Sequence, residues 1–150
     1  MNAKELCDGA MAMAEATLTK TGKVAGMVLL HVDDNVAALP YKDGSMPVGL
    51  QQHLIIGLVK GLRAAKKFTG LVLVSEAWLA AQTNPALAGV LRPALDPDRQ
   101  EVVVAFAHGS DGSRQMVTAA IIREGDAVKL GPPETKPDEV QSWLDDAFTD

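Results

Sequence analysis

Two apolar segments, residues 101–108 and 114–123, are separated only by the loop Gly109-Ser110-Asp111-Gly112. Glycine and aspartate tolerate the positive φ angles that tight hairpin turns need. Two strands joined by so short a loop pair side by side and antiparallel. This hairpin therefore limits the possible folds more than any other part of the sequence, because it predicts an antiparallel sheet.

The rest of the chain adds helices and further strands to this hairpin. A second turn, Asp33-Asp34-Asn35, joins two more apolar segments. Hydrophobic periodicity and turn residues predict helices at residues 3–19 and 45–67 and from Pro137 onward, and strands at residues 24–32, 36–41, 71–76 and 128–130. The order α-β-β-α-β-β-β-α, with room for one extra short strand, predicts a single α+β domain over residues 1–150. Three helices are expected to pack on a mixed or mostly antiparallel sheet of three to five strands.

The helix predicted at residues 45–67 begins with Ser45 as its cap and carries two internal glycines, Gly57 and Gly61. Six apolar residues recur at helical spacing and are expected to face the core: Val48, Leu54, Ile55, Leu58, Leu62 and Ala65. Each internal glycine costs about 1 kcal/mol relative to alanine. The two glycines are either points where a strand or a partner helix packs closely against the helix backbone or tolerated defects, and close packing within the domain is favoured.

Composition and charge exclude several classes of function. The formal net charge is −5 and the pI is about 5.1, whereas proteins that hold nucleic acid neutralise phosphates with Lys and Arg. No apolar run is long enough to span a membrane. The single cysteine, Cys7, cannot form an internal disulfide, and the first residues lack a secretory signal. We therefore expect a cytoplasmic protein that binds neither nucleic acid nor membrane.

Charged residues and one tryptophan gather between the predicted third and fourth strands. Glu76 ends the third strand and Trp78 follows it, while Asp98 and Arg99 precede the fourth strand, which begins at Glu101. The Arg99 guanidinium suits a carboxylate partner, for which Glu76 or Glu101 is the candidate. The group is either an ion network that braces the intervening loop or a ligand or partner pocket floored by Trp78. The brace is favoured, because ion pairs often fix loops without binding a ligand.

His31, Asp33 and Asp34 lie close together at the end of the first strand and could offer ligands to a divalent cation. No other acidic residue or histidine stands at a recognisable ligand spacing from them, so Asp33 and Asp34 are interpreted as turn residues. Cys7 lies on the apolar side of the first helix, and no serine carries a nucleophile motif. The sequence therefore predicts no catalytic nucleophile, no metal site and no cofactor.

The segment around Glu76 also carries a resemblance to other proteins. Its pattern consists of Ser75, Glu76, Ala77 and Trp78, followed by Pro93, Asp96, Pro97, Arg99 and Glu101. This pattern resembles a loose set of uncharacterised bacterial and phage proteins, which implies a shared fold and no transferable activity. The order of elements resembles the roadblock and profilin-like group of small α+β domains. That resemblance implies a dimeric or scaffolding module and carries no specific function.

These observations favour a non-enzymatic binding module, regulatory or scaffolding, that acts through protein–protein contacts or homo-oligomerisation. We expect a homo-oligomer, with a second protein as a further candidate partner. The first alternative is a small-molecule or metal-dependent enzyme that uses Glu76 with His31, His53 or His108. The second alternative is a phage or mobile-element protein that acts on a host protein.

Overall fold

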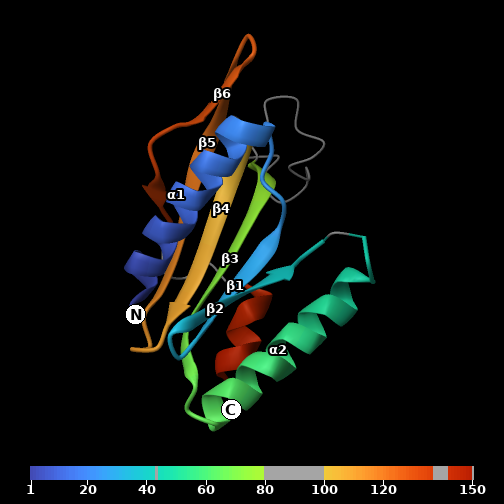
Figure 1. The fold of residues 1–150 in the computed structure, drawn as a ribbon, viewed down its shortest axis with the longest axis vertical. Helices are drawn as coiled ribbons and strands as arrows, with labels where there is room; N and C mark the ends of the chain where they lie inside the picture. Colours follow the sequence, from blue (N-terminus) through green and yellow to red (C-terminus); the bar gives the residue numbers. More distant parts are fainter. Residues whose placement is uncertain (43, 80–99, 137–141, 150) are drawn as a thin grey trace, which may run out of the picture.

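The strands form a sheet in which every neighbouring pair runs antiparallel (Figure 1). The computed structural model describes residues 1–42, 44–79, 100–136 and 142–149. The strands are β1 (Met27–Val32), β2 (Asn35–Pro40), β3 (Phe68–Leu79), β4 (Gln100–Gly109), β5 (Arg114–Glu124), β6 (Ala127–Leu130) and β7 (Glu134–Thr135). Their order is β2-β1-β3-β4-β5-β6, and β7 pairs with β5. The predicted α+β class is confirmed, but the seven strands of the described residues exceed the predicted three to five, because β6 and β7 both add to β5.

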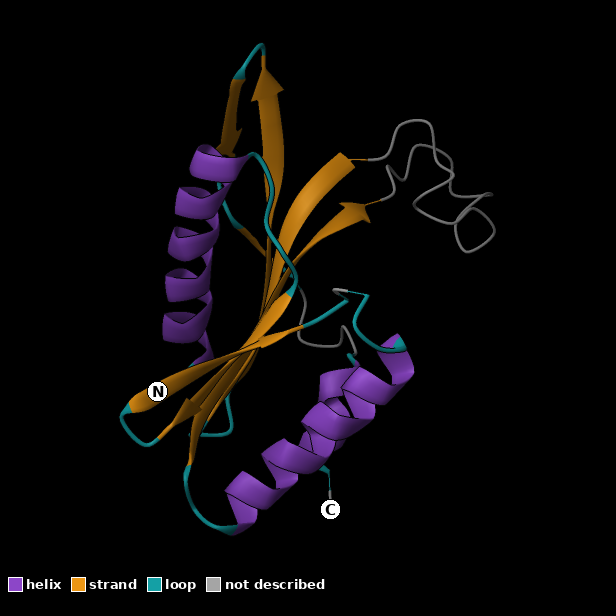
Figure 2. Ribbon diagram, turned by 45° about the vertical axis from the view of Figure 1, so that its right-hand side comes forward, coloured by secondary structure: helices purple, strands orange, loops and turns teal. Residues whose placement is uncertain are grey.

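Helix α1 (Ala3–Thr21) covers one face of the sheet, over β3 to β6 (Figure 2). The Asn2 side chain accepts a hydrogen bond from the Glu5 amide at its start, and Gly22 ends the helix with a φ of 80°. The buried side of the helix consists of Ala3, Leu6, Cys7, Ala10, Met11, Ala14 and Leu18. The apolar position predicted for Cys7 is therefore confirmed. No helix in the described ranges is long and apolar enough to cross a membrane.

Helix α2 (Val48–Ala64) and the 3-10 helix η3 (Trp143–Phe148) lie on the opposite face of the sheet from α1 (Figure 2). Leu144 and Ala147 of η3 are fully buried in the core on this face. Helix η3 begins at Trp143, and the Ser142 side chain caps its first turn. Its predicted start at Pro137 lies outside the described residues.

The prediction for α2 was wrong about its start and about part of the side that faces the core, although Ile55 is buried as predicted and Leu62 packs against the core. Pro47 occupies the position before the first helical residue, so Ser45 is not the cap. The buried residues of the helix are Gln51, Ile55 and Val59. Two of the leucines expected in the core are exposed: Leu54 by 53% and Leu58 by 45%. The reason is that α2 packs chiefly against η3 and meets the sheet along one narrow side only.

Candidate functional site

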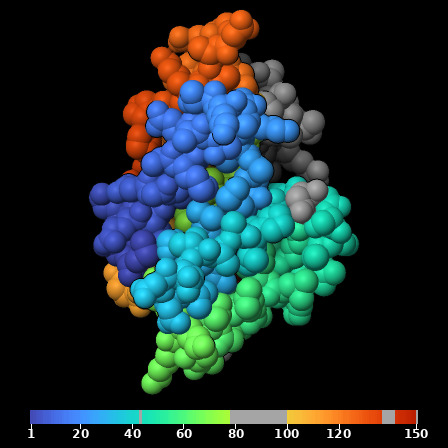
Figure 3. All heavy atoms as spheres, viewed as in Figure 1, coloured from blue at the N-terminus to red at the C-terminus, as the bar shows by residue number. Residues whose placement is uncertain are grey.

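Exposed large hydrophobic side chains gather in one region of the described structure. Seven such side chains are exposed, and five of them belong to α2 or to the segment just before it: Met46, Val48, Leu50, Leu54 and Leu58. A sixth, Val36, is on strand β2. Figure 3 shows the β2 and α2 segments side by side on one face of the molecule. Because contiguous exposed apolar side chains mark interaction sites, this region is the strongest candidate for a functional surface.

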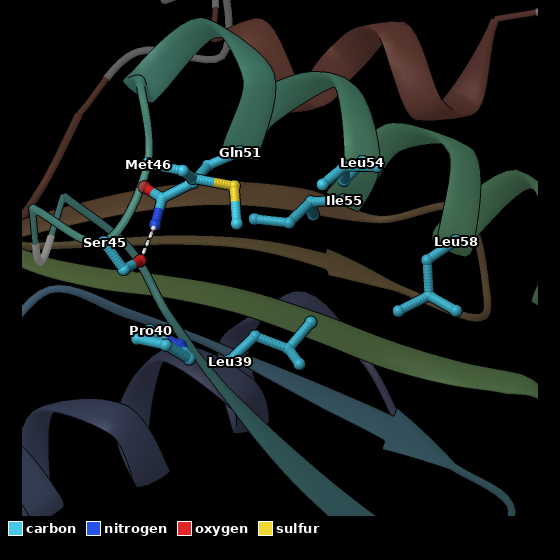
Figure 4. A pocket seen from close by; sticks show the side chains of 8 residues that line it. All are labelled: Leu39, Pro40, Ser45, Met46, Gln51, Leu54, Ile55 and Leu58. Atoms are coloured by element: carbon cyan, nitrogen blue, oxygen red, sulfur yellow. Dashed lines mark hydrogen bonds between the residues drawn. The ribbon is translucent and has the colours of Figure 1, made fainter.

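A groove separates strand β2 from helix α2 at this surface (Figure 4). Leu39 and Pro40 of β2 form one wall, and Leu54, Ile55 and Leu58 of α2 form the other. We call it the α2–β2 groove. Its cavity has a volume of about 230 Å³. Both walls are apolar, so the groove is suited to hydrophobic side chains of another protein segment rather than to a charged ligand.

Gln51 fixes the polar end of the α2–β2 groove. Its side chain is nearly buried, and its Nε2 donates a 3.4 Å hydrogen bond to Ser45 Oγ. Its Oε1 accepts a 2.9 Å hydrogen bond from the Lys42 amide. Lys42 has a φ of 57°, which turns the chain away from β2 at this point. The bonds to Gln51 therefore hold the connection between β2 and α2 in a defined position.

The exposed side of α2 is apolar along its length. Leu50, Leu54 and Leu58 follow one another at four-residue steps, which places them on one side of the helix. Gly57 and Gly61 lie on the same side, and a Cβ added at either would meet no described atom within 4 Å. The interpretation of these glycines as close contacts within the domain is therefore wrong. Every charged residue of α2 lies off this side.

Strand β2 ends the sheet, and no described strand pairs with its outer side. The 2.9 Å hydrogen bond from the Tyr41 amide to the Gly26 carbonyl continues the ladder between β2 and β1. Bonding to β1 alternates along the strand, so the backbone groups of Val36 and Ala38 point away from the sheet. Pro40 occupies the next outward position, where its missing N–H breaks no bond to β1. An open edge beside exposed leucines is a template for a further strand.

The carboxylates predicted as site residues brace the connection between α1 and β1. Glu76 Oε1 accepts a 2.6 Å hydrogen bond from the Val24 amide. Glu101 pairs with Arg123 at 2.9 Å, and Arg123 also donates to the Gly22 carbonyl at 3.3 Å. Both carboxylates therefore help to hold the chain that leaves α1 against the sheet.

The other members of that predicted group are described only in part. Asp98 and Arg99 lie outside the described residues, and so does the predicted ion pair of Arg99. Strand β3 continues to Leu79, and its register sets Trp78 opposite Glu101 on β4. The predicted end of this strand at Glu76 was wrong, because pairing with the first residues of β4 extends it.

The structure does not bring Glu76 together with a histidine. His31 pairs with Gly70, six residues before Glu76 on β3, which corresponds to about 20 Å along a strand. His108 lies on the opposite face of the sheet, because strand residues alternate in direction and Glu76 pairs with Val103. His53 is exposed on α2. The chain has three histidines in all, so the geometry does not support an acid–base pair built on Glu76.

The residues considered as metal ligands form a turn. Asp33 has a φ of 52°, and its amide donates a 3.1 Å hydrogen bond to the Lys67 carbonyl. Thr69 Oγ1 donates to the Asp33 carbonyl at 3.3 Å. His31 is half-buried, and burial lowers the pKa of its side chain. Within the described ranges no three His, Cys, Asp or Glu side chains are grouped so that they could hold a metal ion.

A polar network that the sequence did not predict joins η3 to the sheet. His108 Nε2 lies 2.9 Å from Asp145 Oδ1, and Arg114 donates a 2.8 Å hydrogen bond to each Asp145 carboxylate oxygen. The His108 ring stacks on Phe148 with ring centroids 3.9 Å apart. These partners are 37 and 31 residues apart along the chain, so no local pattern could have revealed them. Its geometry indicates a structural clamp for η3.

The fold is expected to lose stability as the pH falls from about 7 to about 5, in part because of His108. Burial has the largest influence and lowers the pKa of His108. Asp145 raises this pKa and the nearby Arg114 and Arg63 lower it, so that the pKa of His108 lies below its ordinary value. The unfolded chain therefore binds the proton first, near the ordinary histidine pKa of about 6.5. Stability is full above that pH and is lost as the pH falls toward the pKa of the folded state. Urea unfolding at a series of pH values measures this loss.

Two histidine variants test this pH dependence. His108→Gln is expected to flatten the profile between about pH 7 and about pH 5. His31→Gln removes the separate contribution of His31, whose pKa is also lowered. Burial by itself would raise the pKa of Asp145, but the charge of Arg114 and the hydrogen bonds from Arg114, the Ser142 amide and His108 together lower it, so the contribution of Asp145 is lost only at more acidic pH. A slope that His108→Gln leaves unchanged would contradict the assignment.

The Cys7 thiol is buried among apolar neighbours on α1. Only 1% of the residue is exposed, and burial raises the pKa of the thiol to about 12. Its Sγ lies 3.8 Å from the Ala105 carbonyl oxygen and 3.6 Å from that of Gln115. A protonated, inaccessible thiol is a poor nucleophile, so Cys7 serves packing.

Comparison with protein-family models gave no match, and searches of curated proteins and of solved structures gave none either. The resemblance to roadblock and profilin-like domains is therefore supported only at the level of the α+β class and the order of helices and strands. The exposed apolar region at β2 and α2 is the strongest functional feature of the described structure.

Proposed function

We propose that this protein is a non-enzymatic binding module, regulatory or scaffolding in role, that acts by homo-oligomerisation through the α2–β2 groove and the apolar side of α2. One observation carries the proposal. Leu50, Leu54 and Leu58 are exposed on a side of α2 that has no charged residue. A helix side that faces solvent normally carries polar side chains. Contact with another protein surface would remove these leucines from water.

The exposed leucines can supply a useful stabilisation to an assembly. Complete burial of one leucine side chain is worth about 1.5–3 kcal/mol, and about half of Leu54 and of Leu58 is still exposed. In a two-fold symmetric contact each copy contributes the same residues, so every such gain occurs twice. Gly57 and Gly61 leave room for the close approach of a second backbone.

Two further features support the proposal. The order of helices and strands is similar to that of roadblock and profilin-like domains, a group of dimeric or scaffolding modules. The lone cysteine, Cys7, is a free buried thiol. A chain without a structural disulfide fits the cytoplasmic location that we include in the proposal.

Replacing Leu54 and Leu58 together by glutamate is expected to abolish assembly. The carboxylates of two copies would then meet in an apolar contact without counter-charges, where buried charge is strongly unfavourable. Sedimentation velocity over a concentration series measures the effect. We expect wild type to sediment as an oligomer and the double variant as a monomer. Thermal unfolding of the monomeric fold should change little, because both side chains are exposed.

Ala12 and Ala16 provide the matched control, because they lie four residues apart on the exposed side of α1. The variant Ala12→Glu with Ala16→Glu is expected to assemble like wild type. An oligomer that survives the two leucine substitutions would show that the contact lies elsewhere. A wild-type protein that stays monomeric over the whole series would refute self-assembly.

A further inference from the structure

We infer that a second copy of this chain docks at the α2–β2 groove by pairing its own strand β2, edge to edge and antiparallel, with β2 of the first. The inference deepens the homo-oligomerisation proposed above and rests on it. Three features carry it. They are the open outer edge of β2, the apolar side of α2 beside that edge, and opposite charges at the two ends of β2.

An edge strand can pair with its own copy when the two run antiparallel, because a two-fold axis then relates them. The outward backbone groups of β2 belong to Val36 and Ala38, as the register with β1 requires. The outward N–H and C=O groups of one β2 strand must face the outward groups of the other. Two symmetric registers near the middle of the strand meet this condition, one centred on Ala37 and one centred on Ala38. In both registers the N–H groups of Val36 and Ala38 find carbonyl acceptors on the partner.

The same two-fold rotation brings the two α2 helices together. Its axis stands perpendicular to the sheet, so both helices lie side by side on one face of the extended sheet. Leu54 and Leu58 line the groove together with Leu39 of β2, so the apolar side of α2 is directed toward this edge (Figure 4). Gly57 and Gly61 on that side let a second helix approach closely. One symmetry operation therefore covers both the open edge and the exposed leucines.

The charges at the two ends of β2 complement their own copy. Asp34 precedes the strand and Lys42 follows it, and both are exposed. Asp34 lies in the turn before the strand and Lys42 at the turn after it, so the register centred on Ala38 brings Asp34 and the partner's Lys42 to the same end of the paired strands. In the register centred on Ala37 the two lie two residues further apart along the strands, a separation that a long lysine side chain can span. An unrelated strand would need a positive charge near Asp34 and a negative charge near Lys42. In a second copy that runs antiparallel, Lys42 and Asp34 supply these two charges.

Cysteine cross-linking tests the strand pairing directly. Opposed residues of antiparallel strands have Cα atoms about 4.5–5.5 Å apart, which a disulfide accepts. We expect Ala37→Cys or Ala38→Cys, according to the register, to give a disulfide-linked dimer under mild oxidation on a non-reducing gel. Two controls are expected to stay uncross-linked. They are wild type, whose Cys7 is buried, and Ala16→Cys on the exposed side of α1.

Exchange of the end charges gives a second readout. Asp34→Lys and Lys42→Asp each place like charges together and are expected to weaken dimerisation about tenfold. The double variant is expected to return to within about threefold of wild type. Aspartate tolerates the left-handed backbone at Lys42, where φ is 57°, so this substitution does not disturb the turn. Sedimentation equilibrium measures the dissociation constants.

The outcomes separate this inference from the proposed function. If wild type dimerises and the leucine double variant does not, while neither β2 cysteine cross-links, the strand pairing is wrong and the proposed surface stands. Single charge variants without effect, or a double variant that is not restored, also contradict the pairing. Equal cross-linking of Ala16→Cys would indicate random collision and would count against it. A monomeric wild type contradicts both the inference and the proposed function.

Discussion

Replacing Asp145 by alanine is expected to lower the free energy of unfolding by about 2–3 kcal/mol. The Asp145 carboxylate accepts hydrogen bonds from Arg114, from the Ser142 amide and from His108. Its removal leaves the nearly buried His108 side chain and the Arg114 guanidinium without this partner. It also loosens η3, whose Leu144 is fully buried in the core on this face of the sheet.

Urea denaturation followed by circular dichroism measures this loss for Asp145→Ala. The neighbouring Asp146→Ala is the matched control, because Asp146 is exposed and its side chain makes no hydrogen bond among the described residues. We expect the control to change the unfolding free energy by less than about 0.5 kcal/mol. Equal effects of the two variants would show that the network with His108 and Arg114 does not hold η3.

Replacing Gly26 by alanine is expected to destabilise the fold by about 2–3 kcal/mol. A Cβ at this position would lie 2.5 Å from the Tyr41 carbonyl oxygen and 3.5 Å from the Tyr41 carbonyl carbon. Backbone atoms cannot rotate out of the way as a flexible side chain can. The Tyr41 amide also donates to the Gly26 carbonyl at 2.9 Å, so relief of the clash would break the last bond between the β2 and β1 segments. We expect the assembly to weaken as well, because the end of β2 would move.

Gly9→Ala is the matched control for this prediction. Gly9 lies within α1, and a Cβ added there would meet no described atom within 4 Å. Alanine should therefore stabilise the helix by about 0.5–1 kcal/mol. Thermal and urea unfolding compare the two variants. A Gly26→Ala protein as stable as wild type would show that the backbone between Gly26 and Tyr41 can shift freely.

The structure agrees best with the prediction for elements that are specified by residues close together in the sequence. The loop Gly109-Ser110-Asp111-Gly112 joins β4 and β5 as expected, and the turn at Asp33 joins β1 and β2. Turn residues and strand alternation act between neighbours in the chain, so one sequence can reveal them. The length of β3 could not be read in this way, because its last residues are held as a strand by pairing with β4.

The sequence did not predict the candidate site, although it identified several of the site's residues as an apolar side of the second helix. Leu54 and Leu58 were expected in the core, because helical periodicity identifies an apolar side and cannot tell whether the domain or another protein covers it. Gly57 and Gly61 were the one local indication of this surface. Two glycines weaken a helix, and no described contact inside the domain accounts for their presence. The carboxylates Glu76 and Glu101 were predicted as site residues because of their charge, and the structure shows that they bind the Val24 amide and Arg123, respectively.

Short-range patterns in the chain were sufficient for the α+β class, for both hairpins and for the place of Cys7 on the apolar side of α1, because hydrogen-bonded turns and periodic burial depend on nearby residues. Packing alone decided three things: which side of α2 is left uncovered, that β2 ends the sheet, and that His108 meets Asp145. Each of these depends on how elements distant in sequence are arranged in space. For this protein the surface proposed to act in binding belongs to that second group.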